Sequence, residues 1–374
     1  MDPKLSTLRA GPGPALAIAL CATLCSSLAG TAHADVSLPA VSVGAGIQTG
    51  FYSCTNACIY SPGEIPAGDS TVDGFALDSI RLYLNGSVTD QIKMTFNTEY
   101  TGSGTDKVEV LDAIGRFEFS DAVNIWVGRF LPPSDRANLY GPYYANDWTP
   151  FADGVADYYP DVAVGRDNGA AYWGDFGMLK VQAGVFDGQS LGGSTAVADS
   201  SKLLYAGRVT LDFWDKEKGY YLNGTYYGDK DILALGIAAQ SQDSKTAFNL
   251  DGLMEKKLAG AGVIGVEAEY QKDNGLVSNG FDDASSDGWY GLVSFLFAQQ
   301  VGYGKFQVLD KYSEKTYDAT ALTDSTKIKT NEVDINYIIK EFNARVGAYY
   351  VTQTDSALYA SSPKEFGIKL QLQM

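Results

Sequence analysis

Charged side chains at alternating positions are the main chemical feature of this sequence. In the segment 92–100, Lys93 and Glu99 fall on one face, and the other face is largely apolar. This period of two is typical of a β-strand with one polar and one apolar side. A series of such strands would place many charges on a common polar surface, where they could contact ions or small polar solutes.

Cysteine and histidine restrict the possible chemistry. Cys54 and Cys58 are four residues apart, and in an oxidising compartment this close pair predicts a small disulfide. The only histidine is His33, within a stretch that we expect to be removed. A barrel enzyme such as a lipase, acyltransferase or protease normally needs a histidine base, so this alternative is disfavoured. We expect no catalytic residue, no cofactor and no metal site.

The N-terminus predicts export from the cytoplasm. Lys4 and Arg9 precede an apolar stretch, which is followed by the small-residue pattern Ala32-His33-Ala34. This arrangement is typical of a cleaved signal peptide spanning residues 1–34. The alternative of a membrane anchor is weaker, because the apolar stretch is too short for a helix that crosses a bilayer.

The chain is acidic, with a formal net charge of −17. This charge argues against a nucleic-acid partner, whose phosphates attract basic proteins. Acidic loops could bind divalent cations that bridge lipopolysaccharide, or the acids could give a lumen a preference for cations. The alternative is that they only keep exposed loops solvated.

Alternating segments cover most of residues 35–374, and no second apolar run is long enough for a membrane helix. The last segment, 364–374, alternates apolar residues with glycine, lysine and glutamine. We therefore predict an all-β fold, a transmembrane antiparallel β-barrel of about sixteen strands embedded in a lipid bilayer. Strands are expected near 41–53, 75–88, 91–101, 107–119, 122–131, 168–174, 178–187, 202–214, 231–241, 245–255, 260–272, 287–299, 302–312, 327–339, 342–353 and 364–374.

A seventeenth candidate strand, 220–228, is rejected on topology. Single-chain bacterial barrels have an even number of strands, with both termini on the periplasmic side. Counting 220–228 as a strand would place the long polar loops near 272–286, 313–326 and 354–363 on the periplasmic face. Residues 215–231 are therefore predicted to form one long periplasmic turn.

The longest connection, 131–167, contains several charged residues and many aromatic ones. Its charged residues include Asp135, Arg136, Asp147 and Asp153. Loops of this length are uncommon in compact folds unless they are functional. We expect this loop to fold into the barrel and narrow it. An exposed lid, or a plug that blocks the bore, are the alternatives.

One stretch resembles a known family. Gly128-Arg129-Phe130-Leu131-Pro132-Pro133-Ser134, preceded by a strand with Asp112-Ala113-Ile114-Gly115, is similar to the phosphate-selective porins O and P. The resemblance implies a sixteen-stranded, usually homotrimeric barrel in the outer membrane of a Gram-negative bacterium. Selective members line the lumen with arginine and lysine. Here acids occupy the same inward registers, so phosphate selectivity is not expected.

The resulting expectation is a porin that passes small hydrophilic solutes or ions by passive diffusion. A plugged barrel with a structural or adhesive role is the alternative. Tyr100, Trp126 and Trp214 are expected near the membrane interface. Arginines are expected on one side of the constriction and loop acids on the other. The predicted pore-lining residues are Arg81, Lys93, Glu99, Asp112, Arg116, Arg129, Asp135, Arg136, Asp147, Asp153 and Arg208.

Overall fold

The computed structural model describes residues 41–59, 71–101, 108–152, 155, 165–188, 202–276, 285–318, 325–355 and 362–374. The chain divides into two units, Met1–Pro39 and Ala40–Met374, and only the second is described. The predicted signal peptide, residues 1–34, lies outside the described residues. No helix in the described ranges is both long enough and apolar enough to cross a membrane.

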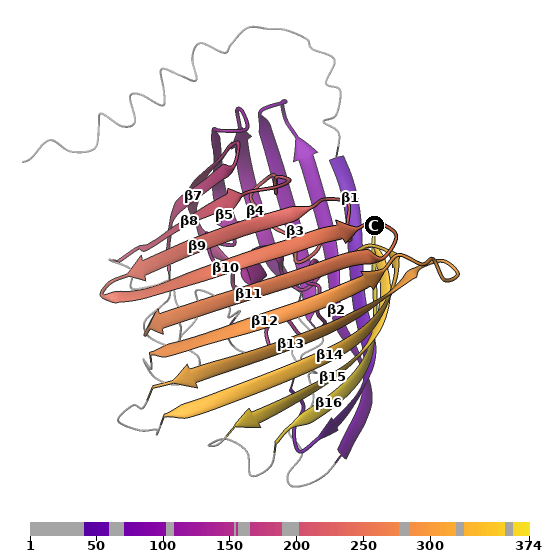
Figure 1. Ribbon diagram of the computed structural model, residues 1–374. Coiled ribbons are helices and arrows are strands. Elements are labelled where there is room, and N and C mark those ends of the chain that lie inside the picture. Colours follow the sequence, from indigo (N-terminus) through magenta and orange to yellow (C-terminus); the bar gives the residue numbers. More distant parts are fainter. Residues whose placement is uncertain are drawn as a thin grey trace, which may run out of the picture. The chain divides into compact units, whose positions relative to one another are not determined.

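Sixteen antiparallel strands form a closed barrel (Figure 1). The barrel closes where β1 pairs with β16, with Gly46 opposite Gln373 and Cys54 opposite Glu365. The strands are β1 (Val41–Thr55), β2 (Thr71–Ser87), β3 (Ile92–Thr101), β4 (Val108–Glu118), β5 (Asn124–Phe130), β6 (Asp167–Phe176), β7 (Leu179–Phe186), β8 (Leu204–Asp212), β9 (Ile232–Gln242), β10 (Lys245–Leu258), β11 (Gly262–Asn274), β12 (Ser286–Phe297), β13 (Lys305–Tyr317), β14 (Thr326–Lys340), β15 (Ala344–Asp355) and β16 (Lys364–Gln373).

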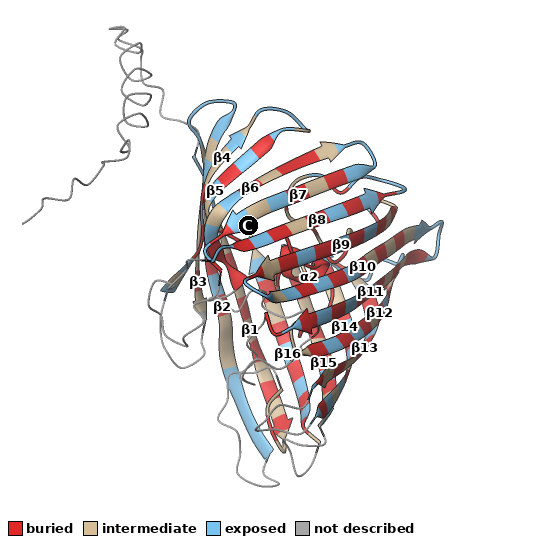
Figure 2. Cartoon of the chain, turned by 90° about the vertical axis from the view of Figure 1, so that its left-hand side faces the viewer, coloured by how far each residue is buried: buried red, intermediate tan, exposed pale blue. Residues whose placement is uncertain are grey.

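The polarity of the barrel is inverted relative to a water-soluble protein. On β14, the inward-facing Asp334 and Asn336 are fully buried, whereas the outward-facing Val333 and Ile335 are 47 % and 58 % exposed. The same alternation of buried and exposed residues runs along most strands (Figure 2). An apolar outer surface around a polar interior is the pattern of a barrel with lipid outside.

The predicted count of sixteen strands is confirmed. The prediction succeeded because the alternation of polar and apolar residues marks each strand and its two faces. Segment 220–228 contains no strand, which agrees with its rejection on topology. Trp126 differs from the prediction: it faces inward and is 4 % exposed, so it is not an interface residue. Its inward register on β5 is shared with Asn124 and Phe130, which are also buried.

Two long connections enter from opposite ends of the barrel. Met374 pairs through its backbone with Ala45 at the end that we call the terminal end. The β8–β9 connection lies at this end, because strands alternate in direction from β1. The β5–β6 connection, which contains the short helix α2 (Arg136–Tyr140), lies at the opposite end, called the loop end.

Candidate functional site in the barrel lumen

The described part of the β5–β6 loop lies inside the ring of strands. Figure 2 shows α2 within this ring, and all five residues of the helix are buried. Asp135 begins the helix as its N-cap, since its side chain accepts a hydrogen bond of 2.8 Å from the backbone N–H of Asn138. An aspartate cap satisfies an amide that the first helical turn leaves unpaired.

A buried network of four charged residues holds α2 in place. Arg208 on β8 donates to both carboxylate oxygens of Asp251 on β10, at 2.5 and 2.7 Å. Arg136 on α2 has its Nε 3.7 Å from the same carboxylate and donates from Nη1 to Glu217 at 2.9 Å. These side chains are at most 1 % exposed. Because each charge has opposite charges beside it, the network tolerates burial that an isolated ion would not.

Gly236 on β9 makes room for this network. A Cβ at Gly236 would lie 2.1 Å from the Arg208 guanidinium and 2.6 Å from the Asp251 carboxylate. Any side chain here would displace the ion pair, so the wall needs glycine at this position.

The pKa values of two loop acids in this region are shifted in opposite directions. Burial raises the pKa of Asp135 to about 7, although Asn138 and Arg208 oppose the shift. Burial would also raise the pKa of Glu217, but Arg136 and Lys180 together hold it below its ordinary value. Glu217 is therefore a charged partner of Arg136 at neutral pH, whereas Asp135 changes its charge near neutrality.

The tip of the loop contacts the wall formed by β13 to β16. Asp147 pairs with Lys311 at 3.0 Å. The indole of Trp148 donates to Asn336 at 2.6 Å, and the guanidinium of Arg345 lies 4.1 Å from its ring centroid. Arg345 also donates to the carbonyl of Ala145 at 2.8 Å. The loop is therefore attached to the far wall by buried polar contacts.

On the other side of the lumen, the loop covers the middle of β2 and the loop-end part of β3. Arg81 and Glu99 pair at 2.8 Å and are 6 % and 5 % exposed. The guanidinium of Arg81 lies 4.7 Å from the ring centroid of Tyr143. These two predicted residues face inward, but they neutralise each other beneath an aromatic cover.

Charged residues nearer the terminal end of β3 and β4 keep access to solvent. Lys93 pairs with Glu118 at 2.8 Å, and Arg116 lies 3.8 Å from the same carboxylate. The side chain of Lys93 is 31 % exposed, that of Glu118 17 % and that of Arg116 21 %. We call the partly exposed inward face of this region the open wall; it consists of Tyr83, Asn85, Lys93, Asn97, Arg116 and Glu118.

The inward face of β8 to β16 differs. Away from the strand ends, its inward-facing charges are between 0 and 3 % exposed, because loop residues and neighbouring side chains cover them. We call this surface the sealed wall, and its charged residues include Arg208, Asp251, Glu267, Lys311, Glu332, Arg345 and Lys369. The expected separation of arginines and acids onto facing sides is not seen, since opposite charges meet directly in pairs.

The remaining predicted residues have different positions. Asp112 faces inward and contacts Arg166 at 3.4 Å. Arg129 takes the outward register between Gly128 and Phe130, and its Nε donates to the carbonyl of Val110 at 3.0 Å. The inward register on β5 belongs to Trp126 and Phe130, so Arg129 does not join the lumen cluster. Asp153 lies outside the described residues.

Sequence reasoning missed the insertion of the β8–β9 connection. Its residues Glu217, Tyr220 and Leu222 are 1 %, 2 % and 3 % exposed, although we expected a periplasmic turn. Tyr220 stacks on Trp126 with 4.6 Å between ring centroids. The available signal was composition: four tyrosines between 220 and 227 are unusual for a solvated turn.

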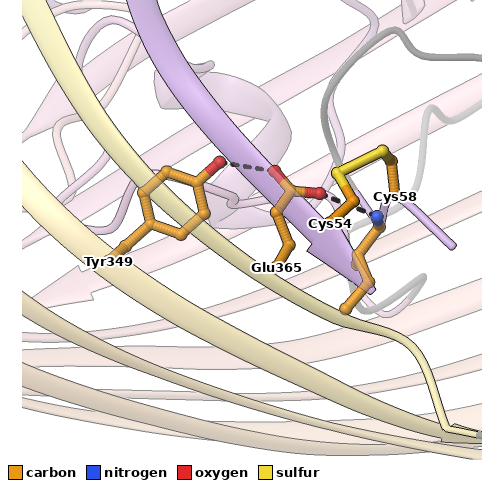
Figure 3. The surroundings of a disulfide bond; sticks show 5 residues. Cys54, Cys58, Tyr349 and Glu365 are labelled. Atoms are coloured by element: carbon orange, nitrogen blue, oxygen red, sulfur yellow. Dashed lines mark hydrogen bonds between the residues drawn. A yellow bond between two sulfur atoms is a disulfide. The ribbon is translucent and has the colours of Figure 1, made fainter. Parts of the chain in front are cut away.

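The disulfide joins Cys54 at the end of β1 to Cys58 (Figure 3). Glu365 on β16 accepts from the backbone N–H of Ile59 at 2.8 Å and from the Tyr349 hydroxyl at 2.5 Å. The bridge belongs to a buried cluster that also contains Trp148. It therefore joins the end of β1 to a cluster that includes the tip of the inserted loop.

Among the described residues, one group has metal-ligating atoms close together: Cys54, Cys58 and Glu365. Both sulfur atoms are used in the disulfide. A disulfide lacks the thiolate that binds zinc or iron, so this group does not form a metal site as it stands.

Comparison with known proteins identifies the fold. The sequence matches no protein-family model and no curated protein. Among solved structures, it is similar to an anion-selective porin from Comamonas acidovorans, at TM-score 0.60 and 14 % identity, over 90 % of this chain and 100 % of that one. OprB of Pseudomonas putida aligns at TM-score 0.60 and 9 % identity, over 89 % and 94 %.

The outer membrane channel DcaP of Acinetobacter baumannii aligns at TM-score 0.57 and 12 % identity, over 90 % of this chain and 97 % of that one. At these identities the likeness concerns architecture. The resemblance to porins is thereby confirmed at the level of fold, and the chain has the sixteen-stranded barrel fold of outer-membrane porins and channels.

Proposed function

We propose that this protein is an outer-membrane porin that passes small hydrophilic solutes or ions by passive diffusion. The observation that carries the proposal is the open wall: charged inward-facing side chains of a closed, lipid-adapted barrel retain 17 to 31 % exposure. Hydrated charges along a lumen let ions pass without full loss of their water. The porin fold supports the same function.

The inserted loop acts as the constriction in this proposal. Arg81, Glu99, Arg136 and Asp147 hold it in place, while Lys93 and Arg116 contact the solute. Catalysis is not part of the proposal, since the sequence has no histidine beyond residue 33 to act as a base.

The proposed location is the outer membrane of a Gram-negative bacterium, after removal of residues 1–34. We also propose a homotrimer with lipopolysaccharide around it. Small outward-facing residues on β6 to β9, including Ala170, Ala183 and Ala239, line a hollow on the outer surface that a neighbouring barrel could occupy. Light scattering in detergent, corrected for bound detergent, distinguishes a trimer from a monomer.

A plugged barrel with a structural or adhesive role is the second candidate, and the sealed wall favours it. Planar bilayer recordings of the mature chain separate the two candidates. Stepwise single-channel conductance supports the porin. A folded, heat-modifiable barrel that gives no conductance would identify a plugged barrel.

A further inference from the structure

The β8–β9 connection, residues 215–231, is fixed inside the lumen from several sides. Its base is closed by a backbone hydrogen bond of 3.0 Å between Asp215 and Asp231. Further along the segment, Thr225, Tyr226 and Gly228 all donate to the carboxylate of Glu255 on β10. The donors are the Thr225 hydroxyl at 2.6 Å and the backbone N–H groups of Tyr226 and Gly228 at 2.9 and 2.8 Å. One wall carboxylate therefore fixes the returning half of the segment.

The outgoing half is fixed by β7 and by the start of the inserted loop. Gln182 donates to the carbonyl of Tyr220 at 2.7 Å, and Lys180 donates to the carbonyl of Glu217. The Tyr220 hydroxyl donates to the carbonyl of Leu131 at 2.8 Å. These contacts join the segment to the first residue of the β5–β6 loop.

The two insertions also meet through their backbones. The N–H of Leu222 donates to the carbonyl of Leu139 at 3.3 Å, and the N–H of Gly224 donates to the carbonyl of Tyr144 at 2.9 Å. Arg136 adds the buried pair with Glu217 and a hydrogen bond of 3.1 Å to the carbonyl of Asn223. A turn that enters from the terminal end is thus locked to a loop that enters from the loop end.

We propose that residues 215–231 form a second constriction, which closes the terminal end over the sealed wall and confines the solute path to the open wall. The inference rests on the proposed pore. Inward-facing residues near the terminal end are buried where the segment covers them, as for Ile232 and Glu255. Lys93, Arg116 and Glu118 remain exposed on the other side. The segment would therefore limit passage to small ions and solutes.

The direct test replaces residues 216–230 with Asn-Gly, a sequence suited to a two-residue hairpin turn. Heat modifiability on a gel shows whether the barrel is folded. We expect single-channel conductance to rise at least about twofold, because the water-filled cross-section widens. Liposome swelling should show admission of larger sugars than the wild type allows. Lys218→Ala, at an exposed position of the same segment, is the matched control and should leave both values unchanged.

The outcomes separate this inference from the proposed function. A silent wild type with a conducting excision variant would support the segment as a closure and overturn the passive pore. A folded excision variant with wild-type conductance and size limit would overturn the second constriction and leave the pore intact. If excision prevents folding, Tyr220→Ala/Tyr226→Ala keeps the backbone and replaces the test: higher conductance supports the inference, and unchanged conductance overturns it.

Discussion

The open wall and the sealed wall carry similar residues in different states. Lys93, Arg116 and Glu118 are paired but 17 to 31 % exposed, whereas Arg208 and Asp251 are paired and at most 1 % exposed. An exposed ion pair is screened by water and contributes little to stability, whereas a buried pair leaves an expensive unpaired charge when one partner is removed. In the proposed pore, the same residue types therefore line the solute path on one wall and stabilise the structure on the other.

The largest expected effect is on the sealed wall. Asp251→Ala leaves Arg208 without its carboxylate and weakens the attachment of Arg136. We expect the free energy of unfolding to fall by about 3–5 kcal/mol, measured by urea titration of the heat-modifiable form. Asp90→Ala, at an exposed turn position, should change stability by less than about 0.5 kcal/mol. Equal losses for the two variants would show that the buried network contributes no more to stability than an exposed turn residue.

The disulfide should have a smaller effect on stability. Cys54→Ser/Cys58→Ser removes a bridge that closes a short loop, and the expected loss is about 2 kcal/mol. The bridge packs in the cluster that contains Trp148, so the inserted loop should also become more susceptible to protease. Unchanged proteolysis of the double variant would show that the disulfide does not support the inserted loop.

The raised pKa of Asp135, beside the sealed wall, predicts that the stability of the fold depends on pH. Its pKa is raised to about 7 from an ordinary value of 3.8, so the folded state favours the protonated form. The resulting stabilisation is complete below about pH 4 and is lost as the pH rises towards 7. Asp135→Asn keeps a neutral oxygen for the helix cap and should reduce this part of the pH dependence. Thermal unfolding at pH 4.5 and 7.5 measures it; identical slopes for both proteins would contradict the assignment.

The smallest expected effect on stability is on the open wall. Glu118→Gln removes the acid between Lys93 and Arg116, and stability should change by less than about 0.5 kcal/mol. The reversal potential across a salt gradient should instead shift towards anions, because two cations remain unbalanced. A large loss of stability with an unchanged reversal potential would assign Glu118 a structural role.

The alternation of polar and apolar residues was sufficient to predict the strands. A shift of the strand register by one residue would move every lumen side chain into the lipid, so the pattern is strongly constrained. It also placed Arg81, Glu99 and Asp112 inward. It failed for Arg129, where the inward register belongs to Trp126 and Phe130. Strand periodicity is weakest in a short strand such as β5, which has seven residues.

Partners in the lumen were beyond sequence reasoning. Arg136 meets Glu217, and Asp147 meets Lys311, across 81 and 164 residues of chain. Such pairs depend on how the inserted segments fit against each other and against the barrel wall, and local sequence patterns do not encode this. The tyrosines of 220–227 were visible, but a turn was expected to face water, so their burial was not predicted.

Thiol modification of single cysteines tests the two-wall account most directly. Lys93→Cys on the open wall and Lys311→Cys on the sealed wall are each reconstituted in planar bilayers, and a charged, water-soluble thiol reagent is added during recording. The account predicts that the current through the Lys93→Cys barrel changes at once, and that the Lys311→Cys barrel does not respond. A response at Lys311→Cys with none at Lys93→Cys would place the path along the other wall and contradict the account.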